Sequence, residues 1–362
     1  MREVCNHATK YAETNTNQFQ RRILVIVNPV SNHKNTVNHF KKYCEPILHS
    51  AGLPIESIKT CYVGHAKTLI ENTDIIPSAV IVAGGEGTAS EVVTGLMRNG
   101  KSICPVAFLP MGSKNNMPLL FGRLDFVKCL TSSILCILNG SLKSKNVIKY
   151  ELFENRHVNI KPIYGLNCFT WGVVRDIDAL KDKYWYFGFF KRHAAILLNA
   201  FSDNLSWKCS ADLIYSPPCN GCSNCYQNIR VVKSNTFKFL QKSNDKKSYN
   251  IFNNRYINCS KKIHCNVETS NLTITSQINS ENVPELLIKS CSILDPGFDF
   301  FKSSFIDPTH LEADQSLKIT SSTIDVIPIK PSKIKFFSID GEEYEVHPIK
   351  ITIIPQAIQV FK

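Results

Sequence analysis

The feature of the sequence that most constrains the fold is an apolar strand pattern that runs directly into a cluster of glycines. Residues 78–83 form a strand pattern that is apolar after Ser78 and includes three β-branched side chains, as in a strand buried on both faces. Gly84-Gly85-Glu86-Gly87-Thr88 follows at once. A helical pattern then covers about residues 89–98. Such glycines let main-chain amides approach a phosphate at the start of a helix, where negative charge is favoured. Alone, the pattern fits an ordinary glycine turn before a capped helix equally well.

Further strand and helix patterns alternate around this motif. Strand patterns occupy residues 22–27, 58–62 and 106–109, and helical patterns occupy residues 36–51 and 66–72. The alternation predicts an open parallel sheet with helices on both faces. Two more loops follow strands of this sheet, and they are Asn28-Pro29-Val30-Ser31 and Pro110-Met111-Gly112-Ser113. Because ligands bind at the carboxyl ends of parallel strands, we expect the three loops to converge on one crevice.

After about residue 145 the pattern changes to short, alternating strands bounded by turn residues. These strands are expected at residues 156–163, 211–216, 268–278, 315–330 and 333–340. They predict an antiparallel β-sandwich domain. The chain of 362 residues is thus expected to comprise a tail, an α/β domain and a β-domain, at residues 1–20, 21–145 and 146–362. Residues 217–265, rich in Asn, Ser, Lys and Cys, are expected to form an insert in the β-domain.

Composition narrows the class of protein. Hydrophobic residues make up 43% and charged residues 20%, which permits a globular core. We expect no membrane-spanning helix, because no run approaches the roughly 18 apolar residues that one needs. Residues 1–22 lack the apolar core of a signal peptide, so the fourteen cysteines are expected to be mostly free thiols in a reducing compartment. Residues 230–262 carry nine basic residues and one acidic residue, which indicates either a solvated insert or a surface for anionic partners, phospholipid or nucleic acid.

Three cysteines in this insert have the spacing of metal ligands. Cys219, Cys222 and Cys225 follow Pro217-Pro218 and could share a structural Zn²⁺. A fourth ligand would come from Cys209, Cys259, His264 or Cys265. Free thiols in a loop, or a disulfide in an oxidising compartment, explain the same spacing. Cys44, Cys129 and Cys136 lie on apolar helical faces and are expected in the core.

Two further segments allow two interpretations each. Asp340-Gly341 stands between strand patterns and is typical of a two-residue hairpin turn, and the next residue, Glu342, could serve as a general base. Residues 184–190 are mostly aromatic and precede Lys191-Arg192. This stretch is typical of core packing, or it forms a lip for acyl chains at a membrane interface.

Together these motifs resemble those of the diacylglycerol kinase catalytic superfamily, which includes the sphingosine and ceramide kinases. They stand in order along the chain as NPVSN (28–32), GGEGT (84–88), LPMGSKNN (109–116) and IDGEE (339–343). The acylglycerol kinase branch is more similar still. Its features are ENTD and IVAGG (71–74, 81–85), EVVTG (91–95), WG, RD and KYWY (171–186), and FSID with EEYE (337–345).

The resemblance implies that ATP and Mg²⁺ bind in a cleft between the two domains. The residues that match nucleotide contacts are Asn28, Ser31, Thr60, Gly84, Gly85, Glu86, Gly87, Thr88, Ser90, Gly112 and Ser113. Glu342 matches the catalytic base, with Asp340 and Glu86 in the Mg²⁺ and nucleotide network, and Asp176 matches a residue that contacts the lipid. Three positions depart from the pattern: Glu86 replaces Asp, Asn32 replaces Gly, and Asn115-Asn116 replaces Asn-Asp.

The function implied by the resemblance is phosphorylation of monoacylglycerol and diacylglycerol, which gives lysophosphatidic and phosphatidic acid. The partners would be these lipids and an anionic membrane surface, with no nucleic acid. The implied location is the mitochondrial inner membrane or intermembrane space. One alternative is a sphingosine or ceramide kinase, which would use the same loops. The departures motivate another, a weakly active or inactive subunit of the mitochondrial inner-membrane complex that inserts carrier proteins.

Overall fold

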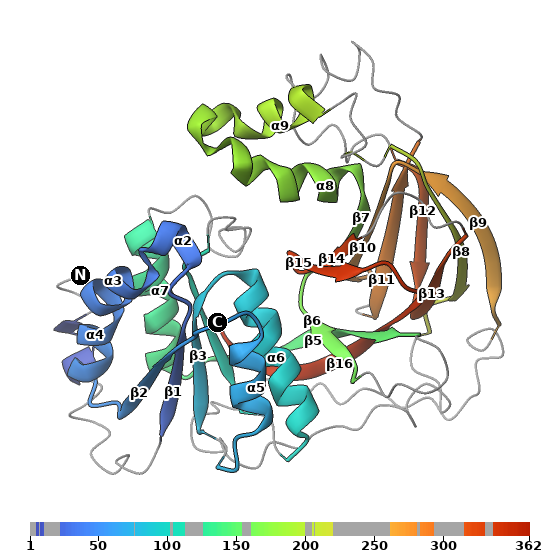
Figure 1. Cartoon of the computed structure of the whole chain (residues 1–362). Coiled ribbons are helices and arrows are strands. Elements are labelled where there is room, and N and C mark those ends of the chain that lie inside the picture. Colours follow the sequence, from blue (N-terminus) through green and yellow to red (C-terminus); the bar gives the residue numbers. More distant parts are fainter. Residues whose placement is uncertain are drawn as a thin grey trace, which may run out of the picture. The chain divides into compact units, whose positions relative to one another are not determined.

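The computed structural model of the chain falls into two compact units (Figure 1). It describes residues 5–6, 8–10, 22–75, 77–101, 104–112, 126–153, 161–199, 205, 207–219, 261–280, 283–292, 315–329 and 336–362. Unit 1 holds the described residues up to Val147 and those from Pro355 to Lys362, and unit 2 holds those from Ile148 to Ile354. Each unit is described by itself below.

Unit 1 is built on a parallel sheet with the strand order β2-β1-β3-β4 (Figure 1). The strands are β1 (Ile23–Val27), β2 (Ile55–Lys59), β3 (Ala79–Gly84) and β4 (Val106–Pro110). β1 and β3 are buried along their whole length, which explains why their sequences are continuously apolar rather than alternating. The end of β16 (Ile349–Phe361) extends this sheet, with Val360 beside Val106 in parallel register. The predicted open parallel sheet is confirmed.

Helices cover both faces of this sheet. They are α2 (Ser31–Lys34), α3 (Thr36–His39), η1 (Phe40–Cys44), α4 (Glu45–Ser50), α5 (His65–Glu71), α6 (Glu86–Asn99) and α7 (Phe126–Asn139). Because successive strand side chains point to opposite faces, Val25 and Ile81 join one core with α4 and α7. Leu24 and Val80 join a second core with α5 and α6. Helix α6 begins at Glu86, earlier than the predicted residue 89, so most of the glycine motif lies in its first turn.

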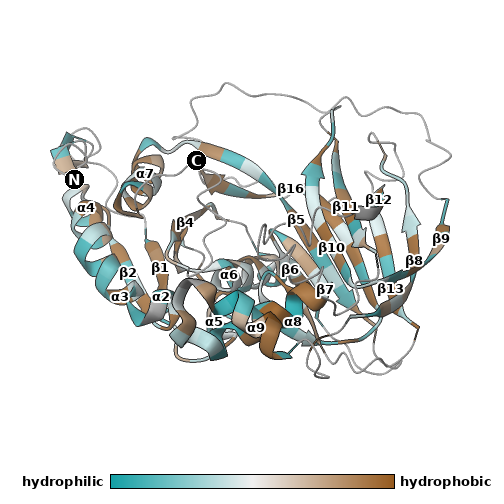
Figure 2. Ribbon diagram, turned by 90° about the horizontal axis from the view of Figure 1, so that it is seen from above, coloured by the Kyte–Doolittle hydropathy of each residue, from teal (hydrophilic) through white to brown (hydrophobic). Residues whose placement is uncertain are grey.

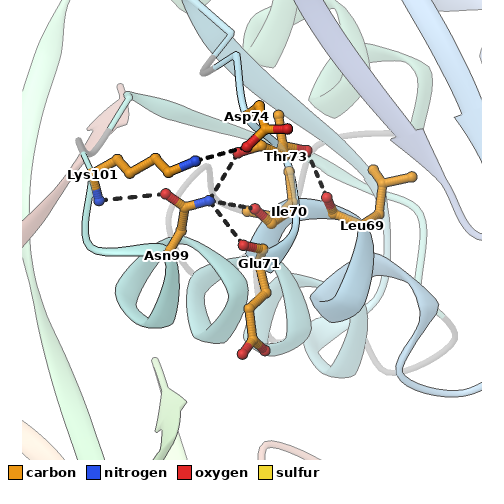
Figure 3. A network of polar contacts seen from close by, with 7 residues as sticks. All are labelled: Leu69, Ile70, Glu71, Thr73, Asp74, Asn99 and Lys101. Carbon is orange, nitrogen blue, oxygen red and sulfur yellow. Dashed lines mark hydrogen bonds and ion pairs between the residues drawn. The ribbon is translucent and has the colours of Figure 1, made fainter.

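Helices α5 and α6 are joined by a polar network around Asn99 (Figure 3). The Asn99 side-chain amide lies within hydrogen-bond distance of three carbonyl oxygens, those of Ile70, Glu71 and Thr73, at 3.1, 2.9 and 3.0 Å. It thereby supplies a hydrogen-bond donor to the last carbonyl groups of α5, which have no partner within the helix. The ENTD motif at residues 71–74 is therefore the end of a helix, held by its neighbour in the fold.

Unit 2 is a sandwich of two antiparallel sheets, as predicted. One sheet has the order β12-β11-β10-β7-β14-β15. The other contains β16, β13, β8 and β9 in that order, with β5 beside β16 and β6 beside β5. The strands are β5 (Leu142–Leu152), β6 (Ile163–Gly165), β7 (Cys168–Gly172), β8 (Cys209–Ser216), β9 (Ile263–Thr269), β10 (Asn271–Ile278), β11 (Pro284–Cys291), β12 (Gln315–Ser321), β13 (Thr323–Pro328), β14 (Phe336–Ile339) and β15 (Glu342–Glu345). Both colours of the hydropathy scale run along β10 (Figure 2), in which Leu272 and Ile274 are buried and Thr273 and Thr275 are partly exposed. β11 is buried along most of its length. Trp171, Leu213 and Ile351 belong to one core that both sheets share.

A helical segment follows β7, where the sequence pattern indicated only strands and an aromatic stretch. It consists of α8 (Val173–Leu180), η3 (Lys181–Phe190) and α9 (Lys191–Asn199). The hypothesis that the aromatic stretch packs in the core is wrong for four of its side chains. Trp185, Tyr186, Phe187 and Phe190 are 75%, 61%, 44% and 56% exposed.

The described helices are all too short or too polar to span a lipid bilayer. Several predicted strands differ from those observed. The segment expected at residues 268–278 is divided between β9 and β10, and that at residues 315–330 between β12 and β13. The strand expected at residues 58–62 is observed at Ile55–Lys59, and most of the strand expected at residues 156–163 lies outside the described residues. The predicted tail at residues 1–20 and most of the predicted insert also lie outside them.

Candidate active site

The glycine motif forms the junction between strand β3 and helix α6. β3 ends at Gly84, Gly85 occupies the N-cap position, and Glu86, Gly87 and Thr88 form the first turn of the helix. A glycine at the N-cap supplies no side-chain acceptor to the first amides of the helix. The main-chain amides of this turn are therefore suited to an anionic ligand, and the helix dipole adds a favourable positive potential.

Close packing at this junction leaves no room for a side chain at Gly84, and Gly85 lies in contact with the third loop. A Cβ atom on Gly84 would lie 2.9 Å from the hydroxyl oxygen of Thr88. A Cβ atom on Gly85 would lie 3.5 Å from the Cα atom of Gly112, which belongs to the third loop. The amide of Met111 also donates to the carbonyl of Gly84 at 3.1 Å. The third loop is thus held directly against the glycine motif.

The first loop meets the same junction. The side-chain amide of Asn28 donates to the hydroxyl of Thr88 at 2.8 Å, and its carbonyl oxygen accepts from the amide of Val30 at 3.0 Å. The Thr36 hydroxyl lies 3.0 Å from the carbonyl of Ser31 and 3.4 Å from that of Met111. The structure therefore brings the three predicted loops together at one edge of the unit 1 sheet, as the sequence analysis expected.

Asn32, which replaces a glycine of the family pattern, keeps the backbone shape of a glycine. Its φ angle is 51°, in the left-handed region that glycine adopts easily and that asparagine tolerates better than most residues. Its side-chain nitrogen lies 3.1 Å from Nδ1 of His39 at the end of α3. The first loop thus keeps the left-handed turn, and the Asn32 side chain contacts His39 within unit 1.

Thr60 lies at the end of β2, where its amide donates to the carbonyl of Val27 at 2.9 Å. The next turn leads to Gly64, whose φ angle is 86°. The Glu91 carboxylate accepts from the amides of Gly64 and Ala66 at 2.9 and 3.1 Å, and so caps the start of α5. The capping role of Glu91 is not predicted by the sequence. The presence of Glu91 in the EVVTG motif was the one indication that this residue has a defined role.

The remaining nucleotide candidates are placed as follows. Thr88 and Ser90 are buried in α6, and Glu86 is partly exposed in its first turn. Ser113 and Asn115-Asn116 lie outside the described residues. The nucleotide contacts themselves stay predictions.

In unit 2, Asp340 and Gly341 form the two-residue turn between β14 and β15. Ile339 pairs with Glu342, and the φ angles of Asp340 and Gly341 are 50° and 88°, as in a type I′ hairpin turn. The predicted hairpin is therefore confirmed. Glu342 is the first residue of β15 and is partly exposed.

Asp340 is an anchor for this hairpin. Its carboxylate is 1% exposed and accepts from the amides of Leu166, Cys168 and Asn167 at 2.6, 2.9 and 3.0 Å. Its own amide donates to the carbonyl of Cys168 at 2.9 Å. These contacts bind the hairpin turn to the turn between β6 and β7. A place for Asp340 in a Mg²⁺ network stays a prediction.

Tyr150 and Gly165 lie against the same carboxylate. A Cβ atom on Gly165 would lie 2.9 Å from Oδ2 of Asp340 and 3.0 Å from Cε2 of Tyr150. Burial, and to a smaller extent the negative charge of Asp340, raises the pKa of Tyr150 well above its ordinary value. The Tyr150 hydroxyl has no hydrogen-bond partner among the described residues. Tyr150 is therefore a neutral group under all physiological conditions.

Asp176, the candidate lipid contact, lies in the first turn of α8 and is 5% exposed. Its carboxylate oxygen Oδ1 accepts from Nη1 of Arg175 at 2.8 Å. The other terminal nitrogen of Arg175, Nη2, lies 2.7 Å from Oε1 of Glu343. Contact of Asp176 with a lipid stays a prediction. Arg175 and Glu343 each stand next to a candidate site residue in the sequence, but no motif assigns them a role.

The predicted zinc site is largely beyond the described residues. Cys219 is partly buried just after β8, whereas Cys222 and Cys225 are not described. Within the described part of the chain, no group of three or more His, Cys, Asp or Glu side chains could hold a metal ion. Zinc therefore stays a prediction. Cys44 and Cys129 are buried as expected, while Cys136 is partly exposed.

The parallel sheet with three convergent loops and the β-sandwich with its DGE hairpin define the class of protein. The sequence profile of the diacylglycerol kinase catalytic domain matches residues 22–149, which include all three loops. A crystal structure of a diacylglycerol kinase from Bacillus anthracis str. Sterne shares the fold, with a TM-score of 0.55 and 16% identity over 94% of this chain and 96% of that one. The protein is a lipid kinase.

The second half of the chain narrows this class. The profile of the acylglycerol kinase C-terminal region matches residues 165–362, and the chain belongs to the acylglycerol kinase family. It is 27% identical to mitochondrial acylglycerol kinase of Homo sapiens over 370 aligned positions, covering 94% of this chain and 82% of that protein. It is also 32% identical to sphingoid long-chain bases kinase 1 of Arabidopsis thaliana, over 45% of this chain and 21% of that protein.

Proposed function

We propose that the protein transfers the γ-phosphate of ATP to a free hydroxyl of mono- or diacylglycerol. The products are lysophosphatidic acid and phosphatidic acid. The observation that carries this proposal is the acylglycerol kinase profile over residues 165–362, because this region holds the candidate base Glu342 and the candidate lipid contact Asp176. The names of relatives such as human mitochondrial acylglycerol kinase support the same lipids and a mitochondrial location.

The nucleotide phosphates bind at the start of α6 in this proposal. Support comes from the glycine N-cap, which supplies no side-chain acceptor to the first turn of α6, and from the contacts that hold the first and third loops against this turn. Ser31, Thr60 and Gly112 contact the rest of the nucleotide. Glu86 is the carboxylate that would hold Mg²⁺ at this end of the helix. Bound Mg²⁺ would neutralise charge that develops on the phosphates during transfer.

Glu342 acts as the general base. Its carboxylate takes the proton from the glycerol hydroxyl as the oxygen bonds to the γ-phosphorus, and the bond from that phosphorus to the bridging oxygen of ADP breaks. The hairpin that carries Glu342 is anchored through Asp340, which suits a base whose geometry must be maintained. Asp176 contacts the polar head of the lipid.

The exposed aromatic surface of η3 and α9 docks on an anionic membrane. We define this surface as Trp185, Tyr186, Phe187, Phe190, Leu197 and Leu198, all at least 44% exposed. Hydrophobic colour is visible on α8 and α9 in Figure 2. Lys183 is exposed beside the aromatic side chains, and Lys191 and Arg192 are partly exposed. Aromatic rings with neighbouring cations match the headgroup layer of an anionic bilayer.

A phosphoryl-transfer assay on four lipids tests the substrate proposal. Labelled ATP is offered with detergent-dispersed monoacylglycerol, diacylglycerol, sphingosine or ceramide, and the labelled lipid is measured. Transfer to the glycerides supports the proposal. Transfer to sphingosine or ceramide alone would contradict it and favour the sphingoid alternative, which the Arabidopsis relative supports. Folded protein that phosphorylates none of the four would leave a non-catalytic role as the better account.

Vesicle sedimentation tests the membrane surface. The double variant Trp185→Ser/Phe187→Ser should lose most binding to vesicles that contain anionic lipid. Ile278→Ser is the matched control, because Ile278 is 60% exposed on β10, outside the surface defined above. Equal vesicle binding by the double variant and the control would contradict the proposal that this surface binds the membrane.

A further inference from the structure

The hairpin that carries Glu342 stands at the edge of its sheet. β15 is the last strand in the order β12-β11-β10-β7-β14-β15, so among the described residues it pairs with β14 alone. β14 in turn pairs with β7 at Ser338 and Ile339. An edge strand with few ladder partners opens more easily than the middle of a sheet. The position of Glu342 therefore depends on contacts other than the main-chain hydrogen bonds between β14 and β15.

Arg175 of helix α8 supplies such contacts to both strands of the hairpin. Its Nη2 lies 2.7 Å from Oε1 of Glu343 in β15. Its guanidinium carbon lies 5.3 Å from the ring centroid of Phe336 in β14, within the range of a cation–π interaction. Its Nη1 donates to Asp176 of its own helix at 2.8 Å. One guanidinium thus joins two strands and a helix.

The ion pair with Glu343 contributes little to overall stability. The Glu343 side chain is 50% exposed, and pairs that water screens in this way stabilise folded proteins weakly. Neighbouring residues of a strand point to opposite faces, so Glu343 points away from the face of Glu342. Arg175 therefore holds the strand from the side opposite to the candidate base.

We propose that Arg175 is a positioning residue for the kinase reaction, tying the Glu342 hairpin to helix α8 through Glu343. The inference rests on the role proposed above for Glu342. Arg175 acts through the strand rather than on the substrate. Its planar fork contacts several groups at once, which a lysine ammonium does not reproduce.

The variant Glu343→Ala tests this role while keeping the contact between Arg175 and the buried Asp176. We expect kcat to fall by about tenfold or more, since a displacement near 1 Å can cost about 10²-fold, while KM for ATP and lipid changes little. Glu345→Ala is the matched control. It removes the same charge from the same face of β15, and Glu345 lies 3.7 Å from His347. The control should keep the wild-type kcat.

A second variant and a second measurement complete the test. Arg175→Lys should also lower kcat. In the double variant with Glu343→Ala the two losses should be less than additive, because both changes break the contact between Arg175 and Glu343. Amide hydrogen exchange of residues 336–345 should be faster in Glu343→Ala than in Glu345→Ala. Equal kcat and equal exchange in these two variants would overturn the inference. If the wild type transfers phosphate to no lipid, the proposed function fails, and the exchange measurement still decides whether Arg175 holds the hairpin.

Discussion

The side-chain amide of Asn28 donates a hydrogen bond of 2.8 Å to the hydroxyl of Thr88, a residue 60 positions further along the chain. This bond joins the first loop of unit 1 to the first turn of α6. A side chain at Gly84 would clash with Thr88, because a Cβ atom on Gly84 would lie 2.9 Å from the hydroxyl oxygen of Thr88. The geometry of the proposed phosphate site therefore depends on a contact between two loops.

Replacement of Gly84 by alanine should weaken ATP binding. The new methyl group would displace Thr88, break its bond with Asn28 and shift the amides at the start of α6. We expect KM for ATP to rise by about tenfold or more, the effect of roughly 1.4 kcal/mol in binding. Titration of activity or of nucleotide binding measures the change. Asn28→Ala should act in the same direction, and unchanged ATP affinity in both variants would argue against the site.

Asp340→Asn should destabilise unit 2. The carboxylate accepts three main-chain hydrogen bonds while 1% exposed, and an asparagine amide would direct donors at some of those amides. Losing charged hydrogen bonds and leaving buried amides unpaired should cost about 2–4 kcal/mol in the free energy of unfolding. Urea unfolding gives this value. Asp325→Asn, at a partly exposed position in β13, serves as the control and should change stability little.

Gly95→Ala should destabilise unit 1, although alanine in a helix interior normally stabilises it. A Cβ atom at this position would lie 2.7 Å from the carbonyl oxygen of Lys67 and 2.8 Å from Cβ of Ile70. Helices α5 and α6 would have to separate, at a cost of about 1–3 kcal/mol. The change is measured by thermal or urea unfolding. A gain of roughly 0.5–1 kcal/mol, the usual effect of removing a helical glycine, would show that the helices are not packed as described.

Stability should fall in alkaline solution because of buried thiols. Burial raises the pKa of Cys44 and of Cys104 from 9.0 to about 12. In the unfolded chain these thiols ionise above about pH 9, whereas in the folded protein they stay protonated. The contribution of the buried thiols to the free energy of unfolding is therefore fully present below pH 9. It is lost as the pH rises toward 12, by at most about 1.4 kcal/mol per pH unit for each thiol. Urea unfolding between pH 8 and 11 should show a shallower decline for Cys104→Ala than for the wild type.

The sequence predicts unit 1 well because its strands and loops have local signals. Continuous apolar runs that end in glycine or Asn-Pro mark buried strands and the loops after them. Helix α6 begins before the residue that the sequence pattern predicts, because its first turn consists of Glu86, Gly87 and Thr88, whose composition is typical of a loop. Several signature residues of the family, in ENTD and EVVTG, serve to pack α5 on α6, as Asn99, Glu91 and Gly95 show.

The sequence is less informative where contacts are distant or side chains face water. The aromatic stretch at residues 184–190 has the composition of a core, and only the structure shows that Trp185 is 75% exposed. The partners of Asp340 are amides more than 170 positions earlier in the chain, and no local pattern identifies them. The contact between Arg175 and Glu343 is equally remote in sequence.

The most direct test of the account compares the wild type with Glu342→Gln in transfer of the γ-phosphate to monoacylglycerol. The substitution keeps the size and hairpin position of the side chain and removes its ability to accept a proton. We predict that ATP binding and stability stay unchanged, and that kcat falls by about 10²–10⁴-fold, the usual contribution of a general base. A Glu342→Gln variant with wild-type kcat would contradict the central claim that Glu342 is the base of this lipid kinase.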